Sequence, residues 1–170
     1  MADNKLKGYM SKKHGQNFET MIERALEDYK RLELAYVSKT PEPMRIIKSL
    51  HNGQFVCCFK SAAEPDFKGV LLDGRCIIFD AKHTDKDRIQ QGCITEEQWK
   101  VFDEYEKLNA LCYVVVSLRF EKFYRIPWNK WKSMKDDLGH KYMSEHDLEG
   151  YEVKFDGFKV RVLDGIEVRD

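Results

Sequence analysis

The fold of this chain is decided by residues 64–82, which read EPDFKGVLLDGRCIIFDAK. Residues 67–72 are mostly apolar and strand-like, and Asp73-Gly74 is a pair that favours a tight hairpin turn. Residues 75–82 are then expected to return as a second strand, apolar on both faces and therefore central in its sheet. The sequence thus predicts an antiparallel hairpin in the middle of the domain.

This hairpin brings three charged side chains together. Side chains alternate between the two faces of a strand, so Asp80 and Lys82 share a face at the far end of the second strand. The turn returns Asp66 to the same end. Two carboxylates can bind a hard divalent cation, and a lysine beside them can position or deprotonate a water molecule. The pattern is typical of metal-dependent nucleases, although an Asp-x-Lys pair alone also occurs at ordinary solvated strand ends.

The composition is that of an ordinary globular domain. The 170 residues are 42% hydrophobic and 34% charged, which suits one domain with a hydrophobic core. The formal net charge is zero, so any surface that binds nucleic acid must consist of local basic patches. No apolar run approaches the roughly 20 residues of a membrane helix, and the five cysteines show no Cys-x-x-Cys pair. We expect a cytoplasmic protein with reduced cysteines, and the cysteine spacing does not indicate a zinc site.

The rest of the pattern predicts a mixed α/β fold. Residues 1–14 are expected to form a flexible basic arm, and Asn17 to cap a first helix. Thr95 and Gln98 match a capping box that opens another helix. Further elements are expected as strands at 34–37, 55–60, 111–118 and 123–126, a short helix after Pro127, and a second hairpin at 151–163 around Asp156-Gly157. The polar residues 83–92, which follow Lys82, are expected to form a loop. This order indicates a single domain over residues 15–170, with a mixed central sheet flanked by helices.

Residues 39–62 are expected to project from this domain. Pro41 and Pro43 exclude a central strand here, and a turn is expected near residues 51–53. The basic side chains of this segment favour contact with DNA over a plain surface loop. Across the chain, the candidate DNA-binding residues are Lys12, Lys13, Lys39, Arg45, Lys48, Lys60, Lys68, His83 and Thr84.

Five features of the sequence carry a resemblance to a known family. They are residues 15–19 (GQNFE), 41–48 (PEPMRIIK), 66–71 (DFKGVL), 74–82 (GRCIIFDAK) and Gln98. In this order they resemble RecU-type Holliday-junction resolvases, members of the PD-(D/E)xK nuclease superfamily. The resemblance implies a restriction-endonuclease-like fold in which residues 39–62 form a stalk. The short chain would suit a phage-encoded member.

The resemblance also implies roles for individual residues. Asp66 and Asp80 would bind Mg²⁺, with Mn²⁺ as a substitute, and Glu19 would complete the acidic set. Lys82 would orient the attacking water, and Gln98 would support the site, although its place in the capping box explains it equally well. Asp80 stands where such proteins more often carry glutamate, which shortens the reach by one methylene group.

The resemblance extends to partners. It implies a symmetric homodimer that resolves four-way DNA junctions in recombination and repair, and family members also bind the recombinase of the host. Two other readings stay open: a nuclease of another DNA substrate, such as a restriction or DNA-processing enzyme, and a DNA-binding or partner-binding module that no longer cuts. Trp128 and Trp131 are candidates for an interface, with core packing as the alternative.

Overall fold

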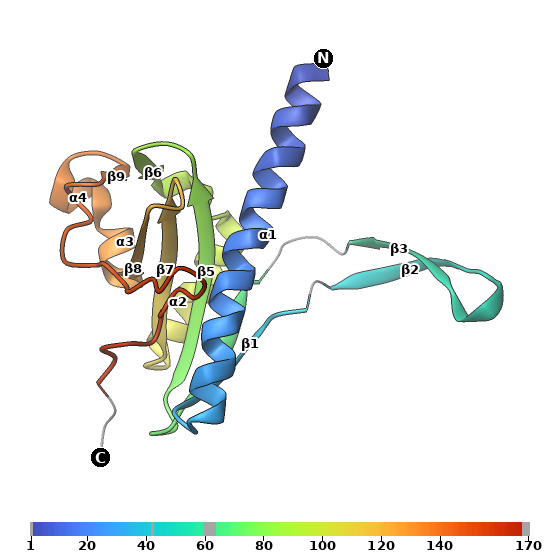
Figure 1. Ribbon diagram of the computed structural model, residues 1–170, viewed down its shortest axis with the longest axis horizontal. Helices are drawn as coiled ribbons and strands as arrows, with labels where there is room; N and C mark the ends of the chain where they lie inside the picture. Colours follow the sequence, from blue (N-terminus) through green and yellow to red (C-terminus); the bar gives the residue numbers. More distant parts are fainter. Residues whose placement is uncertain (1, 42, 60–63, 168–170) are drawn as a thin grey trace.

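A five-stranded mixed sheet forms the centre of the molecule (Figure 1). The computed structural model describes residues 2–41, 43–59 and 64–167. The strand order is β1-β4-β5-β7-β8, and β4 (Phe67–Leu71) and β5 (Cys76–Thr84) pair in antiparallel fashion, with Phe67 opposite Phe79. Gly74 adopts φ +80° in the turn between them. β5 pairs in parallel with β7 (Leu111–Leu118) on its other side. The predicted central hairpin and mixed sheet are confirmed.

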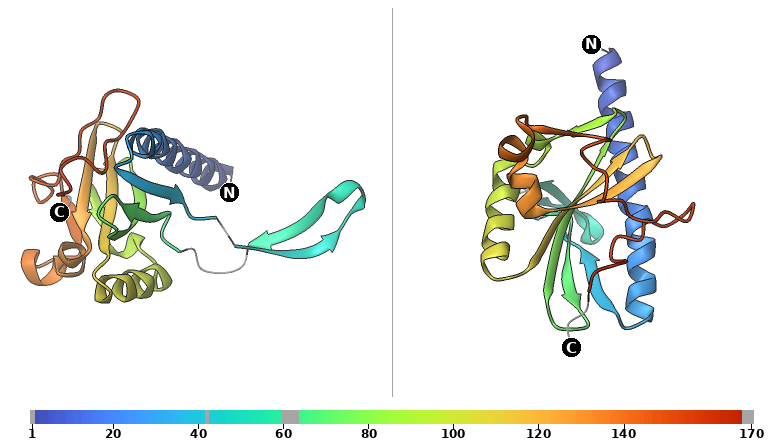
Figure 2. Two further views of the ribbon diagram at one scale, coloured as in Figure 1. Left: turned by 90° about the horizontal axis from the view of Figure 1, so that it is seen from below. Right: turned by 90° about the vertical axis from the view of Figure 1, so that its left-hand side faces the viewer.

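Helices cover both faces of this sheet (Figure 2). α1 (Ala2–Arg31) packs Phe18 and Ile22 against Ile77 and Phe79 of β5. The opposite face is covered by three helices: α2 (Glu96–Lys107), α3 (Trp128–Lys132) and α4 (Met134–Leu138). Successive residues of β5 point to opposite faces of the sheet. They therefore belong to two different hydrophobic cores, one on each face. Ile77 and Phe79 lie on the α1 side, and Ile78 on the α2 side.

The other strands form the two edges of the main sheet and two small additional sheets. Gly69 of β4 lies so close to the neighbouring strand that a Cβ atom there would fall 2.1 Å from the carbonyl oxygen of Tyr36, so this pairing requires glycine. β2 and β3 form a separate hairpin that projects away from the main sheet (Figures 1 and 2). The bounds are β1 Ala35–Lys39, β2 Met44–Ser49, β3 Phe55–Phe59, β6 Arg88–Gln90, β8 Lys122–Pro127 and β9 Tyr142–Ser144, with short 3-10 helices at η1 His51–Gly53 and η2 Gln91–Cys93.

The N-terminal segment differs from the expectation. α1 begins at Ala2, so residues 2–14 are the first turns of a long helix and Asn17 lies inside that helix instead of capping it. The segment contains no proline, and its Lys, Leu, Met and Ala residues favour helix, so nothing in it ends the helix before Asn17. The expected cap was therefore wrong.

Two other local expectations need correction. The second hairpin at 151–163 forms only near its turn, where Phe155 and Val160 form a bridge and Arg161 donates its N–H to the Lys154 carbonyl. Other backbone groups of this segment bond elsewhere, as when Val160 donates its N–H to the Met21 carbonyl. The polar stretch after Lys82, expected as a loop, continues β5 to Thr84 and then forms β6, which pairs with β9. Pairing with a distant strand supplied hydrogen bonds that the local pattern did not reveal.

The tryptophans belong to the core. Trp128 and Trp131 are 1% and 0% exposed and pack with Phe102 on the α2 side of the sheet. They do not form an exposed interface patch. Among the helices of the described residues, none is both long enough and apolar enough to cross a membrane.

Candidate active site

The end of β5 holds the three side chains that the hairpin was expected to bring together. Asp66 lies just before β4, and its Oδ2 accepts a 2.9 Å hydrogen bond from the backbone N–H of Ala81. Asp80 and Lys82 point to the α2 side of β5, where Lys82 Nζ lies 2.7 Å from Asp80 Oδ2. Two carboxylates and one ammonium group therefore share one end of the central hairpin.

Helix α2 reaches this group through Gln98. Its Nε2 donates a 2.6 Å hydrogen bond to Asp80 Oδ1. The same side chain completes the predicted capping box, since its Oε1 accepts from the Thr95 N–H while Thr95 Oγ1 accepts from the Gln98 N–H. The sequence offered capping and a place in the site as alternatives, but this one residue both caps α2 and hydrogen-bonds Asp80.

Burial dominates the electrostatics of the site. Asp80 is fully buried, and burial raises its pKa above the ordinary value. Burial, followed by the neighbouring charge of Asp80, raises the pKa of Asp66 to about 7. Burial by itself would lower the pKa of Lys82, but the Asp80 carboxylate outweighs it and the pKa is raised. Lys82 therefore stays protonated at neutral pH, while the two carboxylates lack sufficient positive charge around them.

The donor set fits a divalent cation. Asp80 Oδ2 is a buried oxygen with no aligned hydrogen-bond donor among the described residues, although it forms the ion pair with Lys82. Oxygen ligands with unmet negative charge are what Mg²⁺ and Mn²⁺ prefer. Glu19 of α1, the third expected acidic residue, instead has its Oε2 2.5 Å from Lys39 Nζ. The charge of Glu19 still acts on Asp66 and contributes to raising its pKa.

Comparison with known proteins identifies the family to which the chain belongs. The family model of recombination protein U, RecU, matches residues 13–167. The chain belongs to the RecU family. A solved structure of Hjc, a Holliday junction resolvase from the archaeal hyperthermophile Archaeoglobus fulgidus, is 10% identical with a TM-score of 0.49, covering 79% of this chain and 91% of that chain. A search of curated proteins gives no match.

In this RecU-family chain the segment that leads to the projecting hairpin leaves the sheet beside Asp66. The N–H of Thr40, just after β1, donates a 2.7 Å hydrogen bond to the carbonyl oxygen of Asp66. Lys39 pairs with Phe67 in the adjoining register of β1 and β4. The end of β1, from which the chain continues toward the β2–β3 hairpin, is therefore fixed beside Asp66. This link had no signal in the sequence because residues 40 and 66 belong to different predicted segments.

The candidate DNA-binding residues of the RecU-family chain lie in different surroundings. Arg45 and Lys48 are exposed on β2, and Lys13 is exposed on α1. Two others are engaged in ion pairs, Lys39 with Glu19 and Lys68 with Glu64 at 2.6 Å. Residue 60 and the side chain of residue 12, both proposed as DNA contacts, lie outside the described residues.

His83 and Thr84 make local contacts. The side chain of His83 is 5% exposed, and its Nδ1 lies 3.1 Å from Ser117 Oγ. Thr84 Oγ1 accepts a hydrogen bond from the N–H of Lys86. His83 therefore offers little surface to a phosphate, and the hairpin is the more accessible of the expected DNA-binding elements.

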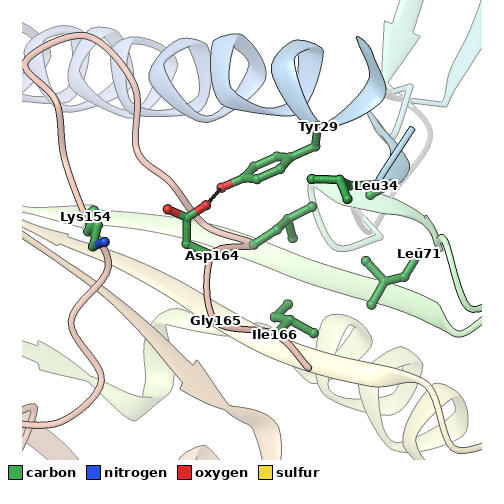
Figure 3. Close-up of a pocket in the computed structure, with 9 residues that line it drawn as sticks. Tyr29, Leu34, Leu71, Lys154, Asp164, Gly165 and Ile166 are labelled. Carbon is green, nitrogen blue, oxygen red and sulfur yellow. Dashed lines mark hydrogen bonds between the residues drawn. The ribbon is translucent and has the colours of Figure 1, made fainter. Parts of the chain in front are cut away.

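The concave surface between the end of α1 and the C-terminal segment is separate from this site. A cavity of about 370 Å³ lies between the end of α1, β1, β4 and the C-terminal segment (Figure 3). Tyr29 and Asp164 face each other there, with the Tyr29 hydroxyl donating a 2.6 Å hydrogen bond to Asp164 Oδ1. None of Asp66, Asp80 or Lys82 lines it. The carboxylates thus lie toward the other side of the sheet.

Proposed function

We propose that this protein is a Holliday-junction resolvase, an endonuclease that hydrolyses DNA phosphodiester bonds at four-way junctions in recombination and repair. The observation that carries the proposal is the joining of Asp66, Asp80 and Lys82 at one end of the central hairpin, in a chain that belongs to the RecU family. The proposed cofactor is Mg²⁺, with Mn²⁺ as a substitute.

Each residue has a role that follows from its surroundings. Asp66 and Asp80 would hold the cation, which when bound supplies Lewis acidity and lowers the pKa of a bound water. Lys82 is protonated, so it can donate hydrogen bonds to orient a water molecule or offset charge on the phosphate, but it is not the base. Gln98 fixes the orientation of Asp80, and Glu19 extends the acidic surface toward Lys39.

The β2–β3 hairpin is the proposed contact with the junction. It projects from the domain, follows a segment that leaves the sheet beside Asp66, and exposes Arg45 and Lys48. It also exposes a set of large apolar side chains: Met44, Ile46, Ile47, Leu50, Phe55 and Val56. Exposed apolar groups beside basic ones suit an element that enters an open junction, where base faces are accessible.

A two-fold dimer is part of the proposal. A four-way junction has two strands to be cut at related positions, and two identical subunits related by a two-fold axis would place one site at each. Binding to a host recombinase, and a cytoplasmic location, are further proposals that rest on family membership.

The decisive experiment incubates purified protein with a labelled four-way junction and with a linear duplex of matching sequence, in Mg²⁺ or in EDTA, at one fixed salt concentration. Salt must be fixed because phosphate contacts make affinity depend strongly on ionic strength. We expect symmetric nicks in the junction alone, and only with the cation. Equal cutting of both substrates would favour a restriction or DNA-processing nuclease, and binding without cutting would favour a non-catalytic DNA-binding module.

A further inference from the structure

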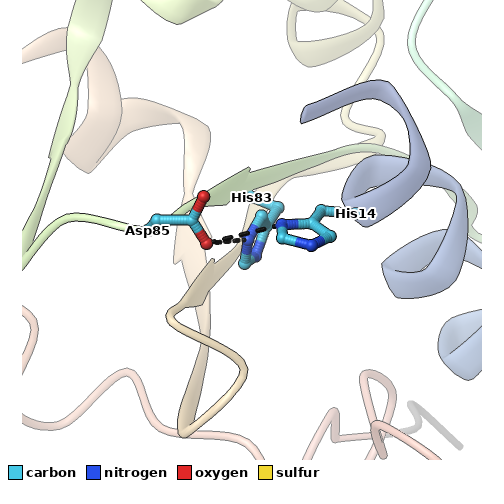
Figure 4. Close-up of side chains that lie close together, drawn as sticks. All are labelled: His14, His83 and Asp85. Atoms are coloured by element: carbon cyan, nitrogen blue, oxygen red, sulfur yellow. Dashed lines mark hydrogen bonds and ion pairs between the residues drawn. The ribbon is translucent and has the colours of Figure 1, made fainter. Parts of the chain in front are cut away.

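A second group of possible metal ligands lies on the opposite side of β5 from the carboxylates. It consists of His14 from α1, His83 from β5 and Asp85 just after β5 (Figure 4). One ligand atom from each lies within 4.8 Å of the others. In the described part of the chain, no other group of three histidine, cysteine or acidic residues meets this condition.

The distances within this group suit a tetrahedral metal ion. His83 Nε2 lies 3.0 Å from Asp85 Oδ1, and His14 Nδ1 lies 3.5 Å from the same oxygen. Ligands at about 2.0–2.1 Å from a tetrahedral ion are separated from each other by about 3.3 Å. The observed separations fall on either side of that value, so an ion would require only small movements of the side chains.

Neighbouring side chains hold the two imidazole rings in position. His83 Nδ1 lies 3.1 Å from the hydroxyl of Ser117, which is fully buried on β7 and pairs with His83 in the sheet. With Nδ1 held by Ser117, the other ring nitrogen, Nε2, is directed at Asp85. Metal-binding histidines are oriented in the same way, by a hydrogen bond at the ring nitrogen that does not bind the metal. Phe120 stacks on the His83 ring at 4.0 Å between centroids and meets the His14 ring edge-on at 5.6 Å.

One ring nitrogen has no hydrogen bond. His14 Nδ1 is buried and without an aligned partner among the described residues, although a plain hydrogen-bonded cluster would use it. An unused nitrogen, a fixed ring and an exposed carboxylate together leave three ligand atoms close enough to bind one cation.

We propose that His14, His83 and Asp85 bind a divalent transition-metal ion of the Zn²⁺ type. Two imidazoles and one carboxylate favour such an ion over Mg²⁺, which prefers oxygen ligands alone. The ion would join the N-terminal turns of α1 to the end of β5, on the face opposite Lys82. It would thereby stabilise the strand that carries the active site, with a fourth position left for water. The proposal does not depend on the proposed nuclease activity.

The test is calorimetric titration of the zinc-free 170-residue protein with Zn²⁺ in a large excess of Mg²⁺, which competes for the two carboxylates. We expect one Zn²⁺ per chain and a rise in the melting temperature, since a ligand that binds only the folded state stabilises it. Co²⁺ should give the visible absorption of a tetrahedral nitrogen and oxygen site. Neither readout involves DNA cleavage.

Three histidine variants make the assignment specific. His14→Gln and His83→Gln should each weaken Zn²⁺ binding by at least about tenfold, whereas His146→Gln should not, because His146 is an exposed residue elsewhere on the surface. His14→Gln remains decisive if the more buried His83→Gln fails to fold. Absence of Zn²⁺ binding by the wild-type protein, or equal binding by wild type and His14→Gln, would overturn the proposal.

Discussion

Gln98 Nε2 donates a 2.6 Å hydrogen bond to Asp80 Oδ1, and this bond joins the first turn of helix α2 to the buried carboxylate of the central strand. Asp80 is fully buried, so the orientation of its carboxylate depends on Gln98 and Lys82. A capping residue thereby became part of the candidate active site.

Replacement of Gln98 should affect both stability and cleavage. Gln98→Ala leaves Asp80 Oδ1 without its donor and should destabilise the protein by about 2 kcal/mol, measured by urea unfolding, with at least a tenfold slower nicking rate. Thr95→Ala is the matched control, because it removes the other half of the capping box without touching Asp80, at a cost of about 1 kcal/mol. Equal nicking rates in the two variants would show that Gln98 only caps the helix.

Asp66→Asn should abolish nicking and yet stabilise the metal-free protein above neutral pH. The pKa of Asp66 is raised to about 7 in the folded state. Between about pH 4 and pH 7 the folded protein therefore holds a proton on Asp66 that the unfolded chain has lost. The free energy of unfolding of the wild type falls as the pH rises through this range. Asparagine has no proton to lose and can still accept from Ala81. Thermal unfolding in EDTA at pH 8 should therefore give a higher melting temperature for the variant. The corresponding gain in the free energy of unfolding should be on the order of 2 kcal/mol.

The Asp66→Asn comparison at pH 4 is its internal control. At that pH the wild-type carboxyl is protonated in the folded state, so the stability difference should largely disappear. A constant difference across the pH range would mean that Asp66 does not titrate near 7.

Lys82→Ala should remove cleavage while leaving binding of the four-way junction within about threefold. An oriented, protonated side chain at the reacting phosphate contributes roughly 10²–10⁴ in rate, so single-turnover nicking should fall by that factor. Lys68→Ala is the control, since Lys68 lies on the adjacent strand and pairs with Glu64. Comparable losses in both variants would argue for a general effect of basic charge.

The projecting hairpin should determine affinity for the junction. Arg45→Ala and Lys48→Ala should each weaken junction binding and reduce the slope of log affinity against log salt by about one unit, as expected for one phosphate contact each. Lys107→Ala is the matched control, because Lys107 is exposed at the end of α2, far from the carboxyl end of β5. Fluorescence anisotropy over a salt series measures all three, and identical slopes for them would exclude the hairpin from the interface.

The sequence by itself determined the central hairpin, the faces of β5 and the capping box, because these depend on contacts between residues close along the chain or on a strict alternation of side chains. The meeting of Asp66, Asp80 and Lys82 followed from the same local geometry. Family membership agrees with the resemblance carried by those segments.

Only the tertiary structure decided the features that join distant segments. The hydrogen bond from Gln98 to Asp80, the anchoring of the end of β1 at Asp66 through Thr40, and the grouping of His14 with His83 each require elements to pack across a sheet. Local propensity contains no information on such distances. Which polar groups are buried, and which partners they find, depends on how the helices pack on the sheet. The same reason explains why residues 151–163 keep only the turn end of their expected hairpin and also make contacts with α1 and β8.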